Sequence, residues 1–288
     1  MREKCAHLSN AEMRYWQNGF SKKRSTVVLV HGFRSERNGL KVVAEKLATK
    51  FNVIVPDLPG FGESSGFRAG KHDMDNYTDA LREFIESLKL GQKPMVVAHS
   101  FGAIIVSKLA YEAPEILGKR VVLVCPIANK KVGGRLRKLD ERLVDFDLAR
   151  DDVGVATGEK ARAKRTIGPK LVAELVSSKL VKTRDRALKE KIRNEQGRFF
   201  GGFSSKKAMI EGVRAINSGS VGMFARDIDK RVLLVAAELD DLTAVQAQKK
   251  LQEKFERAEL VIVEKAGHLV NYEKPDEIAR LAGEFLAG

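Results

Sequence analysis

The sequence predicts an α/β fold in which helices cover both faces of a mostly parallel central sheet. Three observations predict this architecture. Short runs of β-branched and other apolar residues recur along the chain, as in strands that are buried on both faces. Segments with apolar residues at helical spacing separate these runs. The linking loops are short, which favours parallel strands joined by right-handed crossovers.

The order of the expected elements follows this alternation. An antiparallel edge hairpin is expected at residues 12–20, with Asn18-Gly19 as its turn. Buried strands are predicted at 26–30, 51–55, 95–98, 120–125, 231–236 and 260–263. Helices are predicted at 38–51, 75–90, 103–110, 244–255 and 276–286.

Residues 127–229 interrupt this alternation. They contain helical patterns but no strand pattern, and the helices are expected at 135–150, 169–182, 184–196 and 204–217. We therefore predict two parts. Residues 1–126 and 230–288 form the α/β core, and residues 127–229 form a helical cap inserted between two strands of the sheet.

The formal net charge of +14 is unevenly placed. Residues 127–230 hold 25 Lys and Arg against 14 Asp and Glu, which is +11 of the total. A basic surface attracts nucleic acid, anionic lipid or acidic substrates without specificity. A solvated, lysine-rich helical surface has the same composition. No zinc-finger, ribonucleoprotein or basic-zipper motif accompanies the charge, so we expect no specific nucleic-acid partner.

A chain of 288 residues can bury one large core, or one core with an inserted subdomain. No apolar run approaches the roughly 20 residues that span a bilayer. The first residues lack the apolar core of a signal peptide, so we expect a cytoplasmic protein without a membrane span. Cys5 and Cys125 lie far apart and form no metal or redox motif. None of these features indicates an oligomeric state.

The strongest candidate for catalysis lies at residues 95–110. A buried strand pattern stops at Ser100, and a helical pattern resumes at Ala103. A strand, a sharp turn with serine at its apex and a helix form a nucleophile elbow, which needs small residues two positions either side of the serine. Ala98 and Gly102 meet this need. The pentapeptide alone also fits a serine that caps a helix.

A nucleophilic serine needs a base that is oriented by an acid. Where serine occupies such an elbow, the chain order is serine, acid and histidine. His268 is the only histidine that follows Ser100 in the sequence, and it comes after the last predicted strand. We therefore predict that it is the base. The acid is expected on the loop after the preceding strand, where Asp240 is the first choice, Asp241 the second and Glu238 the third.

Two backbone amides would have to bind the oxyanion formed in such a reaction. Phe101, directly after Ser100, would supply one amide. Phe33, on the loop after the 26–30 strand, would supply the other, because Gly32 lets the backbone approach closely. The sequence assigns no residue to substrate binding, and we expect neither a cofactor nor a metal ion.

Five motifs, in this order, resemble the α/β-hydrolase fold superfamily, in its esterase- and lipase-like serine hydrolase branch with a helical cap. They are Val-His31-Gly32-Phe33, Asp57-Leu-Pro-Gly60-Phe-Gly62-Glu-Ser64, Ala-His99-Ser100-Phe-Gly102, Glu-Leu-Asp240 and Ala-Gly-His268. The resemblance covers nearly all of the chain outside 127–229. It implies that Ser100 is the nucleophile, Asp240 the triad acid and His268 the base, with Phe33 and Phe101 as oxyanion donors.

The same resemblance assigns roles to other polar residues of these motifs and their surroundings. It implies that His31 braces loops and that His99 packs away from the elbow. Residues 60–66 are expected to form a structural loop rather than a phosphate-binding one. His72 and Asp73 are expected to be polar surface residues.

Serine at the elbow implies hydrolysis of a carboxylic ester or related acyl bond through an acyl-enzyme. Family members that open epoxides or displace halide carry aspartate there. The expected partner is a small acyl substrate, and the basic insert leaves open an anionic or carrier-protein-bound one. Two alternatives stay open. The same triad serves C–C bond hydrolases, perhydrolases and aminopeptidases, and a hydrolase scaffold can act as a non-catalytic binding protein through its basic cap.

Overall fold

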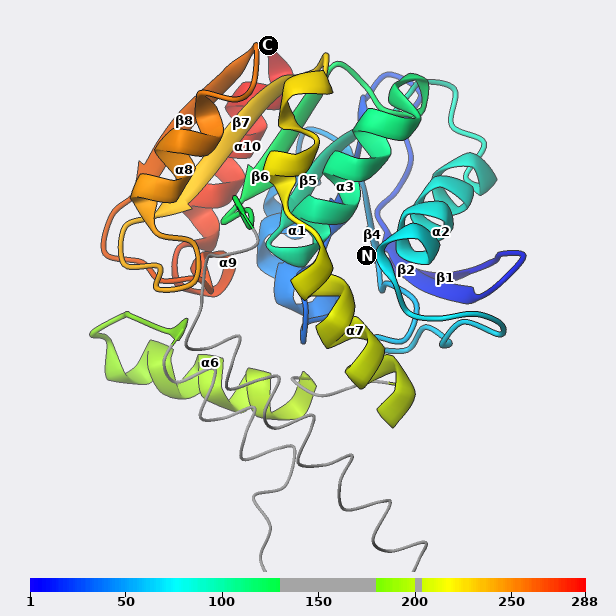
Figure 1. The fold of residues 1–288 in the computed structure, drawn as a ribbon, viewed down its shortest axis with the longest axis horizontal. Coiled ribbons are helices and arrows are strands. Elements are labelled where there is room, and N and C mark those ends of the chain that lie inside the picture. The colour runs from blue at the N-terminus through cyan, green and yellow to red at the C-terminus, as the bar shows by residue number, and fades with distance from the viewer. Residues whose placement is uncertain (130–179, 200–203) are drawn as a thin grey trace, which may run out of the picture.

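The computed structural model describes residues 1–129, 180–199 and 204–288 (Figure 1). An eight-stranded sheet crosses the molecule in the order β1-β2-β4-β3-β5-β6-β7-β8. The strands are β1 (Arg2–His7), β2 (Glu12–Gln17), β3 (Thr26–Val30), β4 (Asn52–Pro56), β5 (Met95–His99), β6 (Arg120–Val124), β7 (Arg231–Ala237) and β8 (Ala258–Val263). β1 and β2 are antiparallel at one edge, and the other six strands are parallel. The predicted sheet is thus confirmed.

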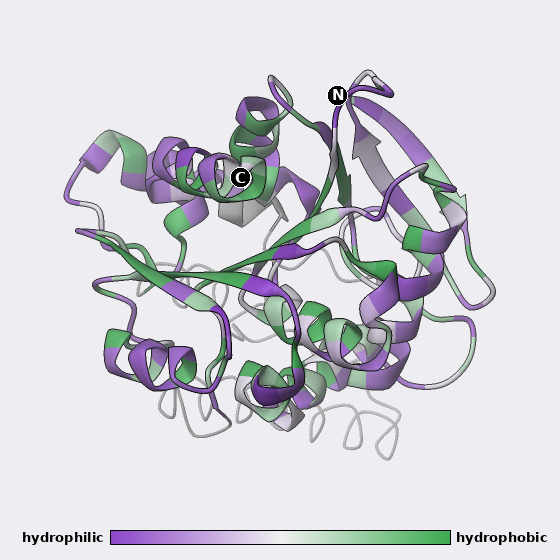
Figure 2. Ribbon diagram, turned by 90° about the horizontal axis from the view of Figure 1, so that it is seen from above, coloured by the Kyte–Doolittle hydropathy of each residue, from purple (hydrophilic) through white to green (hydrophobic). Residues whose placement is uncertain are grey.

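Helices cover both faces of this sheet. They are α1 (Lys41–Leu47), α2 (Met74–Ser87), α3 (Phe101–Glu112), α6 (Arg186–Phe199), α7 (Lys206–Ser218), α8 (Val245–Gln252), α9 (Val270–Glu273) and α10 (Pro275–Ala287), with 3₁₀ turns η1 (Arg37–Leu40), η2 (Pro114–Ile116), η3 (Val221–Met223) and η4 (Ala225–Asp227). α2, α3 and α8 pack on one face, and α1 and α10 on the other (Figure 2). Among the described residues, no helix has the length and hydropathy that crossing a membrane requires.

The core consists of two apolar layers, one on each face of the sheet. All residues of β3 and β4 are buried, as expected for strands that are covered on both sides. α2 turns Tyr77, Leu81 and Phe84 into the first layer. Full burial of such a side chain is worth about 1.5–3 kcal/mol. These layers hold the carboxyl ends of the parallel strands rigidly at one edge, where the candidate site lies.

The edge hairpin exists, but its predicted turn is wrong. β1 and β2 pair from Arg2↔Gln17 to His7↔Glu12, so the turn spans residues 8–11. Asn18 follows β2, and its side chain binds the backbone next to β4: Oδ1 accepts from the amide of Val53 at 2.8 Å, and Nδ2 donates to the carbonyl of Phe51 at 3.0 Å. Asn-Gly after a strand fits a hairpin turn, but it also fits an asparagine whose side chain hydrogen-bonds to the backbone of a neighbouring strand. The dipeptide alone does not distinguish the two.

The inserted segment, defined as residues 127–229, connects neighbouring strands. β6 and β7 pair in parallel from Arg120↔Arg231 onwards, so the chain leaves at the carboxyl end of β6 and re-enters the sheet at the amino end of the adjacent strand β7. The predicted helix 135–150, and all but the end of 169–182, lie outside the described residues. The other two predicted helices are present as α6 and α7. The division into a core and a cap stays a prediction.

Candidate active site

Ser100 alone separates β5 from α3, and it adopts the conformation of a tight elbow. Its φ of 51° and ψ of −110° are unfavourable for a residue with a side chain. Its amide donates to the carbonyl of Val124 at 2.9 Å, which fixes the turn against β6. A β-carbon on Gly102 would lie 2.5 Å from the carbonyl oxygen of His31, so this position needs glycine. The predicted strand–turn–helix geometry is present.

His268 lies between Ser100 and Asp240 and is hydrogen-bonded to both. Its Nε2 is 2.9 Å from Ser100 Oγ, and its Nδ1 is 2.7 Å from Asp240 Oδ2. The three residues are 4–5% exposed. Because a carboxylate only accepts, Nδ1 carries the proton in this arrangement, and Nε2 is left to accept from the serine hydroxyl. The loops after β5, β7 and β8 therefore bring together three residues that are far apart in the sequence.

The environment of Asp240 keeps its carboxylate ionised. Oδ1 accepts from the amides of Leu242 and Thr243, at 2.8 and 3.0 Å, and Oδ2 also accepts from the Thr243 hydroxyl at 2.5 Å. Burial opposes ionisation, but the facing His268 and these donors hold the pKa of Asp240 well below its usual range. Of the three acids considered from the sequence, only this one faces His268.

The other two candidate acids point elsewhere. The Asp241 side chain is 60% exposed and lies 2.5 Å from Lys182 Nζ. Glu238 is exposed and accepts from the backbone amide of Lys265 at 2.8 Å. Their positions in the sequence differ from that of Asp240 by only one or two residues. The choice between them therefore depends on which residue of the loop turns inward, which the structure shows.

Phe33 and Phe101 lie next to one another beside the elbow. Their rings meet edge to face, with centroids 5.8 Å apart. Phe101 is the first residue of α3, so its amide has no acceptor within the helix. A β-carbon on Gly32 would lie only 3.2 Å from Cβ of Ser100, so the loop before Phe33 runs directly beside the serine. This close approach is what two oxyanion donors on these residues require.

His31 connects two loops at the edge of the sheet. It is fully buried, and its Nε2 accepts from the amide of Leu58 at 2.9 Å while Nδ1 lies 2.8 Å from the carbonyl oxygen of Gly32. The ring thus links the Gly32 loop to the 57–66 loop. In that second loop, Asp57 accepts from the amides of Arg37 and Glu63, at 2.7 and 3.1 Å. These contacts agree with the bracing and structural roles expected from the sequence.

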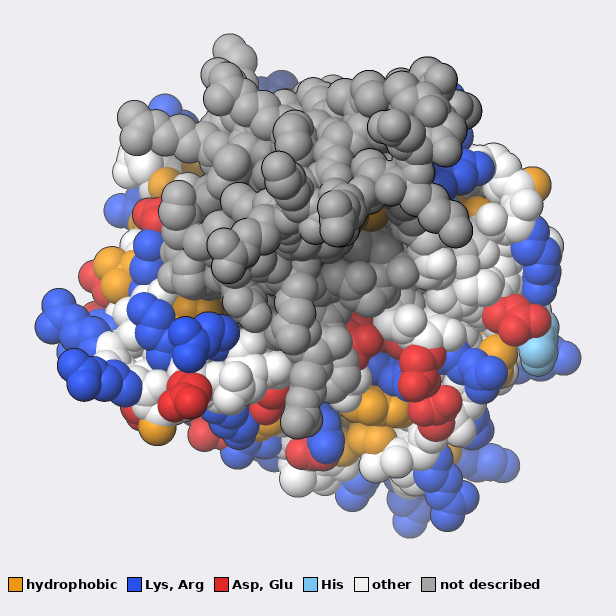
Figure 3. Space-filling view, turned by 90° about the horizontal axis from the view of Figure 1, so that it is seen from below, with side chains coloured by type: hydrophobic (Ala, Val, Ile, Leu, Met, Phe, Trp, Pro, Cys, Tyr) orange, Lys and Arg blue, Asp and Glu red, His pale blue; other side chains and the backbone are white. Residues whose placement is uncertain are grey.

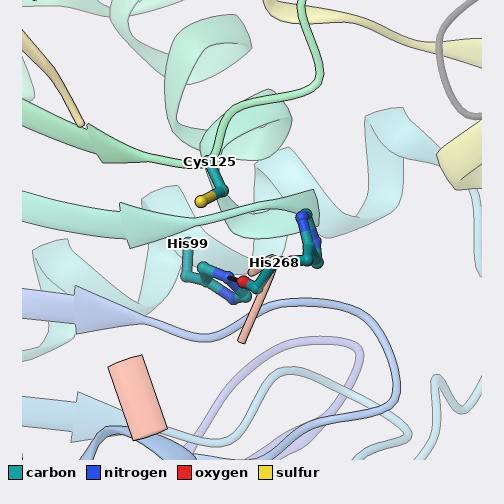
Figure 4. Close-up of side chains that lie close together, drawn as sticks. All are labelled: His99, Cys125 and His268. Atoms are coloured by element: carbon teal, nitrogen blue, oxygen red, sulfur yellow. Dashed lines mark hydrogen bonds between the residues drawn. The ribbon is translucent and has the colours of Figure 1, made fainter. Parts of the chain in front are cut away.

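Three buried side chains, His99, Cys125 and His268, lie close together beneath the elbow (Figure 4). Their possible ligand atoms lie within 4.8 Å of one another. The ring nitrogens of His268 already face Asp240 and Ser100, and Nε2 of His99 faces the carbonyl oxygen of His268. Burial raises the pKa of Cys125 well above its ordinary value, which favours a thiol over the thiolate that metals bind. We therefore interpret this cluster as support for His268.

The sequence indicated only that His99 packs away from the elbow. In the structure its side chain also makes a hydrogen bond. Its Nε2 lies 2.9 Å from the carbonyl oxygen of His268, and since only the ring can donate, the proton is on Nε2. The two rings lie 5.1 Å apart. His99, directly before Ser100, thus holds the main chain of His268, whose ring faces Ser100. No local pattern indicates such a bond, because its partners are 169 positions apart.

The prediction that His72 is a polar surface residue is wrong, whereas Asp73 is partly exposed. His72 is 3% exposed, and its amide and Nδ1 lie 2.8 and 3.1 Å from Glu211 Oε2 on α7. Asp73 caps α2 by accepting from the amide of Asn76 at 3.0 Å. An aspartate just before a helical pattern is a recognisable cap signal. The distant Glu211 is not recognisable from the sequence.

We expect the protein to lose stability in mild acid. Burial lowers the pKa of His31 to about 4, and burial together with the charge of His268 lowers that of His99 to about 3. An unfolded histidine titrates near about 6.5, so below this pH the unfolded chain binds more protons than the folded one. Burial also raises the pKa of Asp57 to about 7, so proton uptake by folded Asp57 offsets about one of the two histidines over this range. The free energy of unfolding should therefore fall with pH from about 6.5 to about 4, by up to about 1.4 kcal/mol per pH unit in total.

Urea denaturation at about pH 7 and about pH 5 measures this loss of stability. A free energy of unfolding that is equal at the two pH values would contradict this prediction.

Comparisons with known proteins agree with this fold. Residues 27–281 match the model of a family described as the alpha/beta hydrolase family. The uncharacterized hydrolase YugF of Bacillus subtilis is 26% identical over 273 residues, which cover 94% of this chain and 93% of that protein.

Solved structures are similar along nearly the whole chain. An enol-lactonase from Burkholderia xenovorans has a TM-score of 0.81 at 17% identity, covering 99% of this chain and all of that one. A thermophilic esterase from Thermogutta terrifontis has a TM-score of 0.78 at 21% identity, covering 100% of this chain and 98% of that one. At these identities the likeness shows the fold, whereas the family model spans most of the chain. The chain therefore belongs to the alpha/beta hydrolase family.

Proposed function

We propose that the chain is a serine hydrolase that cleaves a carboxylic ester, or a related acyl bond, through a covalent acyl-enzyme. The observation that carries this proposal is the hydrogen-bonded line from Ser100 Oγ through His268 to Asp240. This is the arrangement that makes a serine hydroxyl nucleophilic at neutral pH. Membership of a hydrolase family supports it.

In the proposed mechanism, Ser100 Oγ attacks the carbonyl carbon of the substrate while His268 Nε2 takes the hydroxyl proton. Asp240 holds the Nδ1 proton and stabilises the imidazolium. The amides of Phe33 and Phe101 bind the oxyanion, and each such donor is typically worth about 3–4 kcal/mol. His268 then gives its proton to the leaving alkoxide. In the second half, His268 deprotonates a water that attacks the acyl carbon, and the proton returns to Ser100 Oγ.

We also propose that the inserted segment acts as a cap that shapes the acyl pocket. α7 supports this, because a β-carbon on its Gly212 would lie 2.8 Å from the ring of Phe33. The helix therefore passes directly beside a proposed oxyanion residue. Figure 3 shows Lys and Arg side chains interspersed with Asp and Glu around the margin of the face seen from below. The proposed substrate is a small acyl compound, and an anionic or carrier-bound acyl group is the variant to test.

A fluorophosphonate probe tests the chemistry, because it reacts with an activated serine. We expect it to label Ser100 in the wild-type protein and to leave Ser100→Ala unlabelled. A panel of p-nitrophenyl esters of increasing acyl length, with neutral and anionic members and a lactone, then tests the substrate class. A salt-sensitive preference for anionic esters would support an anionic substrate. A wild-type protein that neither reacts with the probe nor hydrolyses any ester would refute the proposed function.

A further inference from the structure

The carboxylate of Glu273 joins two segments that are distant in the sequence. Glu273 ends α9 and is 6% exposed. Its Oε2 accepts from the amide of Gly267, directly before His268, at 2.6 Å. Its Oε1 accepts from the amide of Thr183 at 2.9 Å and from that of Lys182. One buried carboxylate therefore binds both the loop of the proposed base and the inserted segment.

The same two segments also pack directly on one another. A β-carbon on Gly267 would collide with the carbonyl oxygen of Leu180 and would lie 2.7 Å from Cγ of Lys182. Leu180 and Val181 are buried in one apolar cluster with Leu269, on the other side of His268. Residues 180–183 therefore lie against the His268 loop on both sides of the histidine, and a shift of one must be felt by the other.

The hydrogen bonds of Glu273 fix the orientation of residues 180–183 relative to the His268 loop. A carboxylate that accepts from backbone amides forms stronger, shorter bonds than a neutral acceptor does, and burial strengthens them further. The main chain of His268 is otherwise held by His99, which reaches its carbonyl oxygen from β5 at 2.9 Å. Glu273 thus holds the amide of Gly267, and His99 holds the carbonyl of the next residue, His268. Loss of either would let the imidazole shift relative to Ser100.

We propose that Glu273 is a positioning residue that couples residues 180–183 of the inserted segment to the alignment of His268. The placement of this segment then sets the distances from His268 to Ser100 and Asp240. This inference rests on the proposed function. It identifies a regulation of that same site, since whatever moves residues 180–183 changes the rate of the chemical step. Misplacement of a reacting group by about 1 Å can cost about 100-fold in rate.

Glu273→Gln tests the coupling without changing the size of the side chain. The amide has one acceptor oxygen and one NH₂ donor, so either Gly267 or the pair Lys182 and Thr183 must lose its acceptor. We expect kcat for a p-nitrophenyl ester to fall about 10- to 100-fold while KM changes little. The downfield proton resonance of the His268–Asp240 hydrogen bond should weaken. The amides of Gly267 and Thr183 should both exchange faster with deuterium.

Glu83→Gln is the matched control. Glu83 lies on α2 and accepts from the amide and hydroxyl of Ser9, at 2.6 and 2.7 Å, so the change likewise replaces one of two accepting oxygens by an NH₂ group, but here the hydroxyl can accept from it. It should leave kcat and the downfield resonance unchanged. Thr183→Pro is a second test variant, because it removes a donor to Glu273 without altering the triad or Gly267. It should lower kcat in the same direction and carries the test if Glu273→Gln does not fold.

The coupling is overturned if folded Glu273→Gln or Thr183→Pro keeps the wild-type kcat, or if the Glu83 variant loses as much. It is also overturned if only one of the two amides exchanges faster. The proposed function fails separately, when the wild-type protein does not react with a fluorophosphonate. In that case the paired exchange of Gly267 and Thr183 still decides whether the two segments are coupled.

Discussion

Replacing Ser100 by alanine is expected to lower kcat for ester hydrolysis by about 10⁶-fold. Without the hydroxyl, His268 has no proton to take, and no acyl-enzyme can form. His268→Ala should cost about as much, because the serine and its base act as one unit. For the same reason the double variant should be no slower than either single one. Single-turnover kinetics with the fastest ester of the panel measure these rates, and melting temperatures check that each variant is folded.

Ser107→Ala is the matched control for this prediction. Ser107 is a second buried serine, 1% exposed and on α3, but its hydroxyl has no hydrogen-bond partner within the part of the chain that the structure describes. Its loss should leave kcat unchanged. A Ser100→Ala enzyme within about tenfold of the wild-type rate would exclude the proposed nucleophile. A double variant far slower than both single variants would indicate that Ser100 and His268 act independently.

The fold and the grouping of Ser100, Asp240 and His268 could be predicted because both follow from chain order. In a parallel sheet, the carboxyl ends of all strands lie at one edge, so residues just after different strands meet there. Ser100 follows β5, Asp240 follows β7 and His268 follows β8. Apolar runs are enough to place these strands. The sheet order did not need to be known for the three residues to be selected.

The contacts that hold these three residues could not be predicted, because each joins residues without a shared pattern. His99 binds the carbonyl of His268, 169 positions away, and Glu273 binds Thr183, 90 positions away. Both bonds join a side chain to a backbone group. Because almost every residue has the same backbone groups, the residue type of the partner does not indicate such a bond. The burial of His72 leaves no local signal either, because its partner Glu211 is 139 positions away in the inserted segment.

Replacing Asp240 by asparagine is expected to lower kcat by about 10⁴-fold, with the fold intact. The structure fixes which way the new amide points. Oδ1 accepts from the amides of Leu242 and Thr243, so the asparagine oxygen must take that place. The NH₂ group then faces Nδ1 of His268, which can only accept. The imidazole proton moves to Nε2, and the ring can no longer take the proton of Ser100.

Asp241→Asn provides the control for this substitution. It makes the same chemical change on the neighbouring residue, whose carboxylate is exposed and pairs with Lys182. An exposed ion pair contributes at most about 1 kcal/mol, so its loss, including any shift of residues 180–183, should lower kcat by about fivefold at most, far less than Asp240→Asn does. If Asp241→Asn were the slower enzyme, the acid would have been misassigned. If both variants kept the wild-type rate, orientation of His268 by a carboxylate would not be part of the mechanism, and Ser100 would need another source of activation.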